Sequence, residues 1–264
     1  MGTGQVTFCT DPLCTPRQAP APYIRDPKAL TELVQRTPAR LAKGRTGSRI
    51  LTHVYVGIRA EHAIALDAVH AEIPAGFAES LGAVPLQSQC TAKSQYLLYP
   101  DLGRRLAQES VERLAREATA DVDVQIIAGD GLAPWAILRQ GQVLIPALVH
   151  ELSAGGFKVG KPLFVKYARI GIADQIGVLS RARSTIILVG ERPGLGTGDS
   201  LSIYTAFGPR LGQGNAEKNC ISNIRPLGLA PATAAKECAD LMKRTFAAGG
   251  GGVHLIKSQS QGRG

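Results

Sequence analysis

The sequence DVQIIAGDGL fills residues 123–132 and sets the pattern from which the fold can be predicted. A short run of apolar, mostly β-branched residues ends there in Gly-Asp-Gly. The same order, an apolar run followed by glycine or polar residues, returns in PLFVKYARIGI (162–172) and STIILVGERPG (184–194). Apolar runs of this length that end in turn-forming residues are typical of buried strands.

Helical sequences lie between and after these three strands. Residues at about 144–154, DQIGVLSRA (174–182) and ATAAKECADLMKRTFAAG (232–249) place apolar side chains at helical spacing. Strands that alternate with helices are joined by crossovers, which favours parallel pairing. We therefore predict an α/β fold built on a doubly wound parallel sheet.

The N-terminal third is predicted to be mainly helical. KALTELVQRTPARLAKG (28–44), interrupted by Pro38, predicts two short helices, and residues 50–73 predict a longer one. A further helix is expected over 102–118, capped by Asp101.

These patterns divide the chain into three predicted parts. Residues 1–23 are rich in Pro, Thr and Gly and predict a flexible arm. A mainly helical N-terminal domain is expected over 24–88, and the α/β domain over 89–264.

Composition excludes several classes of protein. Hydrophobic residues make up 44% of the 264 residues and charged residues 19%, so a packed core is expected rather than disorder. No run of about 18 uncharged apolar residues occurs and no secretory signal is evident, so we expect neither membrane spanning nor secretion. Five cysteines without a CxxC pair indicate a reducing, cytoplasmic compartment.

The chain is basic, with 30 Lys and Arg against 21 Asp and Glu and a net charge of +9. This charge suits an anionic partner, such as a phosphate-bearing cofactor or an acidic subunit. The basic window over 36–49 has no interleaved aromatic residues on which bases could stack. We therefore expect no nucleic-acid partner, and prefer a subunit or phosphate contact.

Three loops are expected to form a binding site. In open parallel sheets, ligands bind beyond the carboxyl ends of the strands. Residues 129–131, 169–174 and 190–194 each follow a predicted strand and are polar or glycine-rich. We expect the three segments to meet in one crevice, although strand-end loops of this kind also occur where nothing binds.

Motifs for self-sufficient catalysis are incomplete. GGFKVGKP (155–162) has the spacing of a phosphate-binding P-loop, but Pro162 replaces the hydroxyl residue. Its glycines follow a helix, so we interpret them as a helix C-cap. The five histidines have no metal-binding spacing, and we predict no metal site and no catalytic residue. For Cys220, the residues alone favour a small buried hydrophobic side chain over a ligand contact.

Several motifs in consistent order resemble the small subunit (light chain) of ethanolamine ammonia-lyase. The resemblance runs from about residue 24 to 256, and VGERPGL and NCISNIR are its most specific parts. The stretches that carry it are 37–47, 59–63 with 67–69, 99–106, 174–177, 189–195 and 219–225.

The resemblance implies an adenosylcobalamin-dependent lyase that converts ethanolamine to acetaldehyde and ammonia by radical deamination. In this family the large subunit is a TIM barrel that binds ethanolamine. A Rossmann-like domain of the small subunit, here 89–264, clamps the cobalamin against it. The family's cobalamin contacts fall on Ile170, Glu191 and Cys220. The resemblance therefore implies that this chain is active only in a hetero-oligomer with the large subunit.

The resemblance also bears on how the cofactor binds. Cobalamin proteins that replace the lower base by histidine carry a DxHxxG motif, whereas Asp67-Ala-Val-His70 has the wrong spacing. We therefore expect base-on binding. In relatives, a longer N-terminal arm is associated with encapsulation in a bacterial microcompartment, whereas the arm before residue 24 is short here. Both a microcompartment and a plain cytosolic location therefore stay open. The alternative function is a stand-alone cobalamin- or nucleotide-binding module. A methyltransferase or dehydrogenase is disfavoured because the glycine fingerprint is absent.

Overall fold

The computed structural model describes residues 25–37 and 39–261, and the predicted arm over 1–23 lies outside them. The chain forms two compact units that divide in the sequence between Ala63 and Ile64. No helix among the described residues is long and apolar enough to cross a membrane.

The first unit contains one short helix, a small hairpin and the first part of a longer helix. Helix α1 (Pro27–Gln35) is capped at its N-terminus by Asp26, whose carboxylate accepts a hydrogen bond from the Ala29 amide at 2.9 Å. Strands β1 (Arg45–Thr46) and β2 (Arg49–Ile50) pair antiparallel and lead into α2 (Thr52–His70).

The second short helix predicted within 28–44 is wrong. The helix ends at Gln35 because Pro38 disfavours a helical conformation in the residue before it. Beyond this point Ala42 and Gly44 adopt left-handed conformations, with φ of +45° and +78°, which turn the chain toward the hairpin.

The second unit is built on one six-stranded sheet in the order β3-β5-β4-β6-β7-β8. Its strands are β3 (Val84–Gln87), β4 (Val124–Gly129), β5 (Leu163–Lys166), β6 (Ser184–Gly190), β7 (Leu201–Phe207) and β8 (Lys218–Ile224). The α/β prediction and the strands β4, β5 and β6 are confirmed.

The prediction of an all-parallel sheet is wrong for its last two strands. Strands β3 to β6 pair parallel, whereas β7 is antiparallel to both β6 and β8. No crossover helix connects β6 to β7 or β7 to β8, and a parallel pair would need such a crossover. The sheet is therefore mixed.

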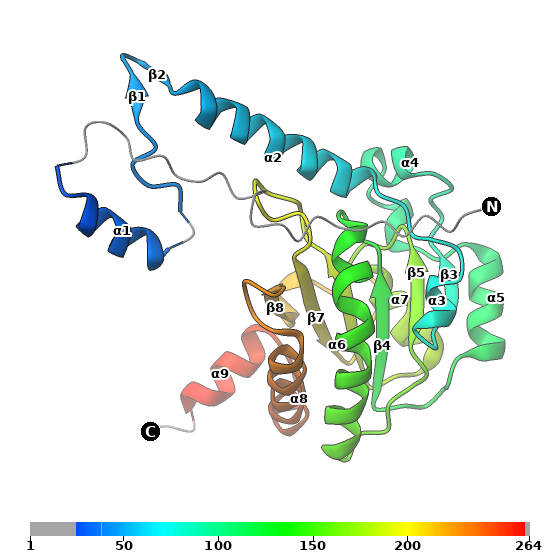
Figure 1. Cartoon of the computed structure of the whole chain (residues 1–264). Coiled ribbons are helices and arrows are strands. Elements are labelled where there is room, and N and C mark those ends of the chain that lie inside the picture. Colours follow the sequence, from blue (N-terminus) through cyan, green and yellow to red (C-terminus); the bar gives the residue numbers. More distant parts are fainter. Residues whose placement is uncertain (1–24, 38, 262–264) are drawn as a thin grey trace. The chain divides into compact units, whose positions relative to one another are not determined.

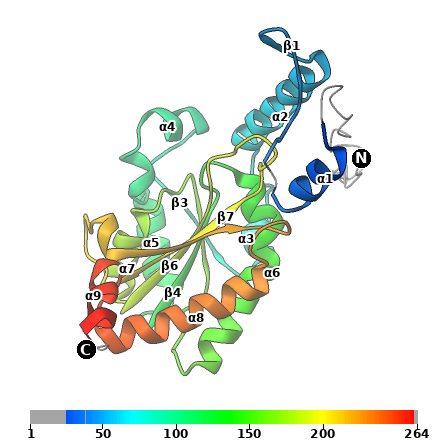
Figure 2. The same cartoon turned by 90° about the vertical axis from the view of Figure 1, so that its left-hand side faces the viewer.

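Helices cover both faces of the sheet (Figures 1 and 2). Helices α3 (Phe77–Ser80), α6 (Pro134–Ala154) and α8 (Pro231–Ala248) pack on one face, and α5 (Gln108–Glu117) and α7 (Ile172–Ser180) on the other. Ile126 belongs to the core of the first face and Ile127 to that of the second. Burial on both faces explains why the central strands are apolar without interruption.

The predicted end of α6 is confirmed, whereas the predicted start of the helix after Asp101 is not. The glycines after α6 lie at its C-terminal end as expected, with Gly156 at φ +85°. The helix predicted over 102–118 forms only as α5 (Gln108–Glu117), and its expected cap at Asp101 is wrong, because a 3₁₀ turn (Leu102–Arg104) follows Asp101. Leu106 instead pairs with Ser88 in an antiparallel bridge, and its amide donates a hydrogen bond to Gln175 Oε1, contacts that keep this segment extended.

Candidate functional site

A cavity of about 180 Å³ lies where β4, β5 and β6 end. Each of the three predicted loop segments contributes to its wall, for example through Gly131, Ile170 and Glu191. The expectation that these segments meet is thus confirmed. The lining residues are Tyr96, Gly131, Leu132, Ala168, Arg169, Ile170, Val189, Gly190, Glu191, Arg192, Ser202 and Tyr204.

Two glycines let the loops after β4 and β6 approach closely. Gly131 has φ +59°, and a Cβ at this position would lie 2.6 Å from the backbone N and O of Gly190. A Cβ at Gly190 would in turn overlap the backbone of Ala133. Only residues without a side chain fit this approach, which brings Glu191 next to the end of β4.

Asp130 fixes the turn after β5. Its carboxylate is 2% exposed and accepts hydrogen bonds from the amides of Tyr167 at 2.9 Å and Ala168 at 3.0 Å. Tyr167 has a left-handed φ of +57°, which is uncommon for a residue with a side chain. Burial raises the pKa of the Asp130 carboxyl, while the Tyr167 amide and the Lys93 charge oppose this rise. The two hydrogen bonds hold the strained turn that leads into Arg169 and Ile170.

Arg169 is held by the segment around α4 (Lys93–Leu98). Its Nη2 donates to the Tyr96 carbonyl at 2.6 Å, and its guanidinium lies 4.6 Å from the centroid of the Tyr96 ring. Its backbone amide donates to the carbonyl of Gly103 at 2.8 Å. These contacts fix one wall of the cavity in position.

Glu191 joins the end of β6 to the two antiparallel strands. Its Oε1 accepts hydrogen bonds from the Ser202 hydroxyl at 2.7 Å and from the Asn223 amide at 2.8 Å. The Glu191 amide donates to the Ser200 carbonyl. The carboxylate therefore has a fixed position in the cavity wall.

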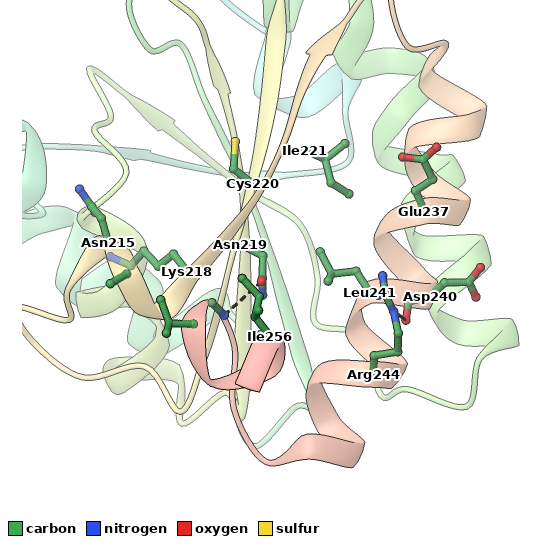
Figure 3. Close-up of a pocket in the computed structure, with 13 residues that line it drawn as sticks. Asn215, Lys218, Asn219, Cys220, Ile221, Glu237, Asp240, Leu241, Arg244 and Ile256 are labelled. Carbon is green, nitrogen blue, oxygen red and sulfur yellow. Dashed lines mark hydrogen bonds between the residues drawn. The ribbon is translucent and has the colours of Figure 1, made fainter. Parts of the chain in front are cut away.

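Cys220 is exposed, so the interpretation of its side chain as a small buried hydrophobic group is wrong. It lies on β8 and lines a separate cavity of about 700 Å³ with α8 and α9 (Val253–Gln261). Figure 3 shows Cys220 on β8, with Glu237 and Leu241 on α8. Cys220 is the register partner of Tyr204, which lines the cavity of Ile170 and Glu191. The structure thus brings Ile170 and Glu191 together and places Cys220 one strand away.

Several residues of this site are missing from the sequence-based prediction. Tyr96, Ser202 and Tyr204 line the cavity, but they lie on α4 and β7, and neither element was predicted. Asp130 lies inside a predicted segment, yet its partners are 37 and 38 residues away in the sequence. No group of three His, Cys, Asp or Glu residues in the described part of the chain could hold a metal ion.

Comparison with known families identifies one that covers most of the chain. The family model of the ethanolamine ammonia-lyase light chain (EutC) matches residues 27–256 of the 264. The match includes both elements of the hairpin in the first unit and every strand of the six-stranded sheet. The chain therefore belongs to the ethanolamine ammonia-lyase light chain family.

Proposed function

We propose that this chain clamps adenosylcobalamin against the large subunit of an ethanolamine ammonia-lyase. The observation that carries this proposal is the shared cavity of Ile170 and Glu191, two of the three positions at which the family contacts cobalamin. The third position, Cys220 on β8, is the register partner of Tyr204 on β7, and Tyr204 lines this cavity.

The cavity wall suits the edge of a corrin ring. A corrin has apolar faces, neutral amide arms and a nucleotide loop with a phosphate. Leu132, Ile170 and Val189 offer apolar contacts, and Glu191 and Arg169 offer an acceptor and donors. A volume of about 180 Å³ is below the roughly 300 Å³ at which sites for whole drug-sized ligands begin. Only a projecting part of the cofactor fits, which supports the proposal that the large subunit covers the rest.

Bound adenosylcobalamin supplies a weak cobalt–carbon bond whose homolysis starts the radical deamination of ethanolamine to acetaldehyde and ammonia. The residues of this chain bind and orient. Ile170 packs against the ligand, Glu191 accepts a hydrogen bond, and the turn held by Asp130 keeps the wall in place. Together they exclude water, and none of them transfers a proton. Ethanolamine is bound mainly by the large subunit, and only the hetero-oligomer is active.

Reconstitution tests this function against the alternative of a stand-alone binding module. The purified chain is mixed with adenosylcobalamin, ethanolamine and the candidate large subunit, and acetaldehyde is assayed. We expect activity in the mixture and none with either chain alone. A tight complex of the two chains that never forms acetaldehyde would favour the binding module. We propose the cytoplasm as the location, with a microcompartment as the alternative.

The cofactor is proposed to bind base-on. None of the described residues that line the cavity is a histidine, so this wall offers no imidazole to replace the lower base. We expect the EPR spectrum of the cobalt(II) form bound to ¹⁵N-histidine-labelled complex to match that of unlabelled complex. Labelling each chain in turn is the control. Coupling of cobalt to a protein nitrogen would show that the base is displaced.

A further inference from the structure

Arg169 and Glu191 lie on the wall of the same small cavity and carry opposite charges. Arg169 follows β5, Glu191 follows β6, and both side chains are fixed by hydrogen bonds to other elements. The cavity therefore presents donors on one side and an acceptor on another.

Most N–H groups of the Arg169 side chain make no hydrogen bond within the described residues. Of the five N–H groups of a guanidinium, one reaches a protein oxygen within the described residues, the Tyr96 carbonyl. Its Nε is buried and has no partner among the described residues. The side-chain stem is held against Gly103, where a Cβ would lie 2.9 Å from Arg169 Cγ. Nε has almost no accessible surface, so a ligand in the cavity is expected to meet the N–H groups of the two Nη atoms, of which only one is bonded within the described residues.

Glu191 offers the complementary group. Both hydrogen bonds that its carboxylate makes within the described residues end on Oε1, which leaves Oε2 for a donor of the ligand. A phosphate at this position would be repelled by the carboxylate, and an ammonium group would be repelled by Arg169 and by the exposed Arg192. A neutral group with both an acceptor and a donor satisfies all of them.

We propose that Arg169 and Glu191 together bind a primary carboxamide, with the amide oxygen on Arg169 and the amide nitrogen on Glu191. The cavity of about 180 Å³ equals roughly six water molecules at about 30 Å³ each, which suits a short amide arm but is too small for a corrin ring. This inference rests on the proposed function, because a corrin ring carries several such arms. It assigns Arg169 as a further cofactor-binding residue.

The test uses the complex of the light chain with its large subunit. Cyanocobalamin and its monocarboxylic acids, in which one side-chain amide is replaced by a carboxylate, are titrated and binding is followed by absorbance and equilibrium dialysis. We expect wild-type complex to bind one of the acids at least about tenfold more weakly than cyanocobalamin, because that carboxylate lacks the N–H donors and meets Glu191.

Three variants assign the effect to the two residues. Glu191→Gln should bring that acid to within about twofold of cyanocobalamin, because the glutamine amide can donate to a carboxylate. Arg169→Met should weaken cyanocobalamin binding about tenfold, and Arg169→Lys should recover part of the loss. Arg104→Met is the matched control, since Arg104 is outside the cavity and pairs with the exposed Asp101.

The outcomes separate this inference from the proposed function. Equal binding of every acid and of cyanocobalamin, or unchanged binding in Arg169→Met, would overturn the carboxamide site while cobalamin binding stands. If Arg169→Met weakened the binding of adenosylcobalamin but not that of cyanocobalamin, the carboxamide site would be overturned too, because both cofactors carry the amides. Wild-type complex that binds no cyanocobalamin would instead contradict the proposed function. Thermal unfolding of each variant identifies any that fails to fold, and Glu191→Gln alone then decides the matter.

Discussion

Replacing Asp130 by alanine should lower the free energy of unfolding by about 4 kcal/mol. The substitution leaves the buried amides of Tyr167 and Ala168 without their acceptor, at a cost of about 1–3 kcal/mol each. It also removes the carboxylate that offsets the charge of Lys93, which is partly buried. Urea unfolding followed by circular dichroism measures the change.

The same substitution should weaken cobalamin binding by the complex. Tyr167 holds its left-handed conformation against an unfavourable backbone energy, and Asp130 supplies the bonds that keep it there. Once the turn relaxes, Arg169 and Ile170 leave the wall of the cavity. Asp101→Ala, which removes an exposed carboxylate, is the control. A loss of stability below about 1 kcal/mol would show that Asp130 does not hold the turn.

Replacing Lys218 by methionine should cost about 3–5 kcal/mol of stability, because it leaves a buried carboxylate unpaired. Lys218 Nζ lies 2.9 Å from Asp174 Oδ2, and both side chains are 5% exposed. Lys218 also donates to the Gln213 carbonyl. The pair connects α7 to the start of β8, two residues before Cys220.

The deficit of Lys218→Met should depend on pH. Burial raises the pKa of Asp174 in the folded state, while Lys218 opposes this rise, so removing the lysine should raise the pKa further. A carboxyl whose folded pKa exceeds its unfolded value of about 3.9 stabilises the fold in acid, and this contribution is lost as the pH rises through the folded pKa. The variant should therefore lose less stability relative to wild type at about pH 5 than at about pH 8.

A double variant separates the unpaired charge from the lost packing. Asp174→Leu combined with Lys218→Met removes both charges, and it should recover most of the stability lost in Lys218→Met. A pH-independent deficit, or a double variant as unstable as the single one, would mean that the unpaired carboxylate is not the cause.

The central strands and their loops could be predicted from the sequence because buried strands need continuous apolar residues, which are visible in a short stretch of sequence. Strands β4 and β6 are buried on both faces, so their apolar runs are continuous. The loops after them carry glycines that the close approach of Gly131 and Gly190 requires. The location of the crevice at the ends of these strands followed directly.

The outer strands could not be predicted in the same way. Strand β8 (KNCISNI) is largely exposed, and β3 (VPLQ) contains Pro85, which edge strands tolerate. Their pairing is decided by tertiary contacts rather than by hydrophobic periodicity. The exposure of Cys220 on β8 depends on the same contacts, which explains why the residue type alone suggested burial. Asp130 lies in one of the predicted loop segments, but the sequence did not reveal that its carboxylate holds the turn after β5.

A structure of the complex of light chain, large subunit and cyanocobalamin is the most direct test of cofactor binding at this sheet edge. We expect the corrin edge to contact Ile170 and Glu191, with one amide arm inside the cavity where β4, β5 and β6 end. Corrin bound elsewhere, for example in the larger cavity between β8, α8 and α9, and out of reach of Ile170 and Glu191, would contradict it.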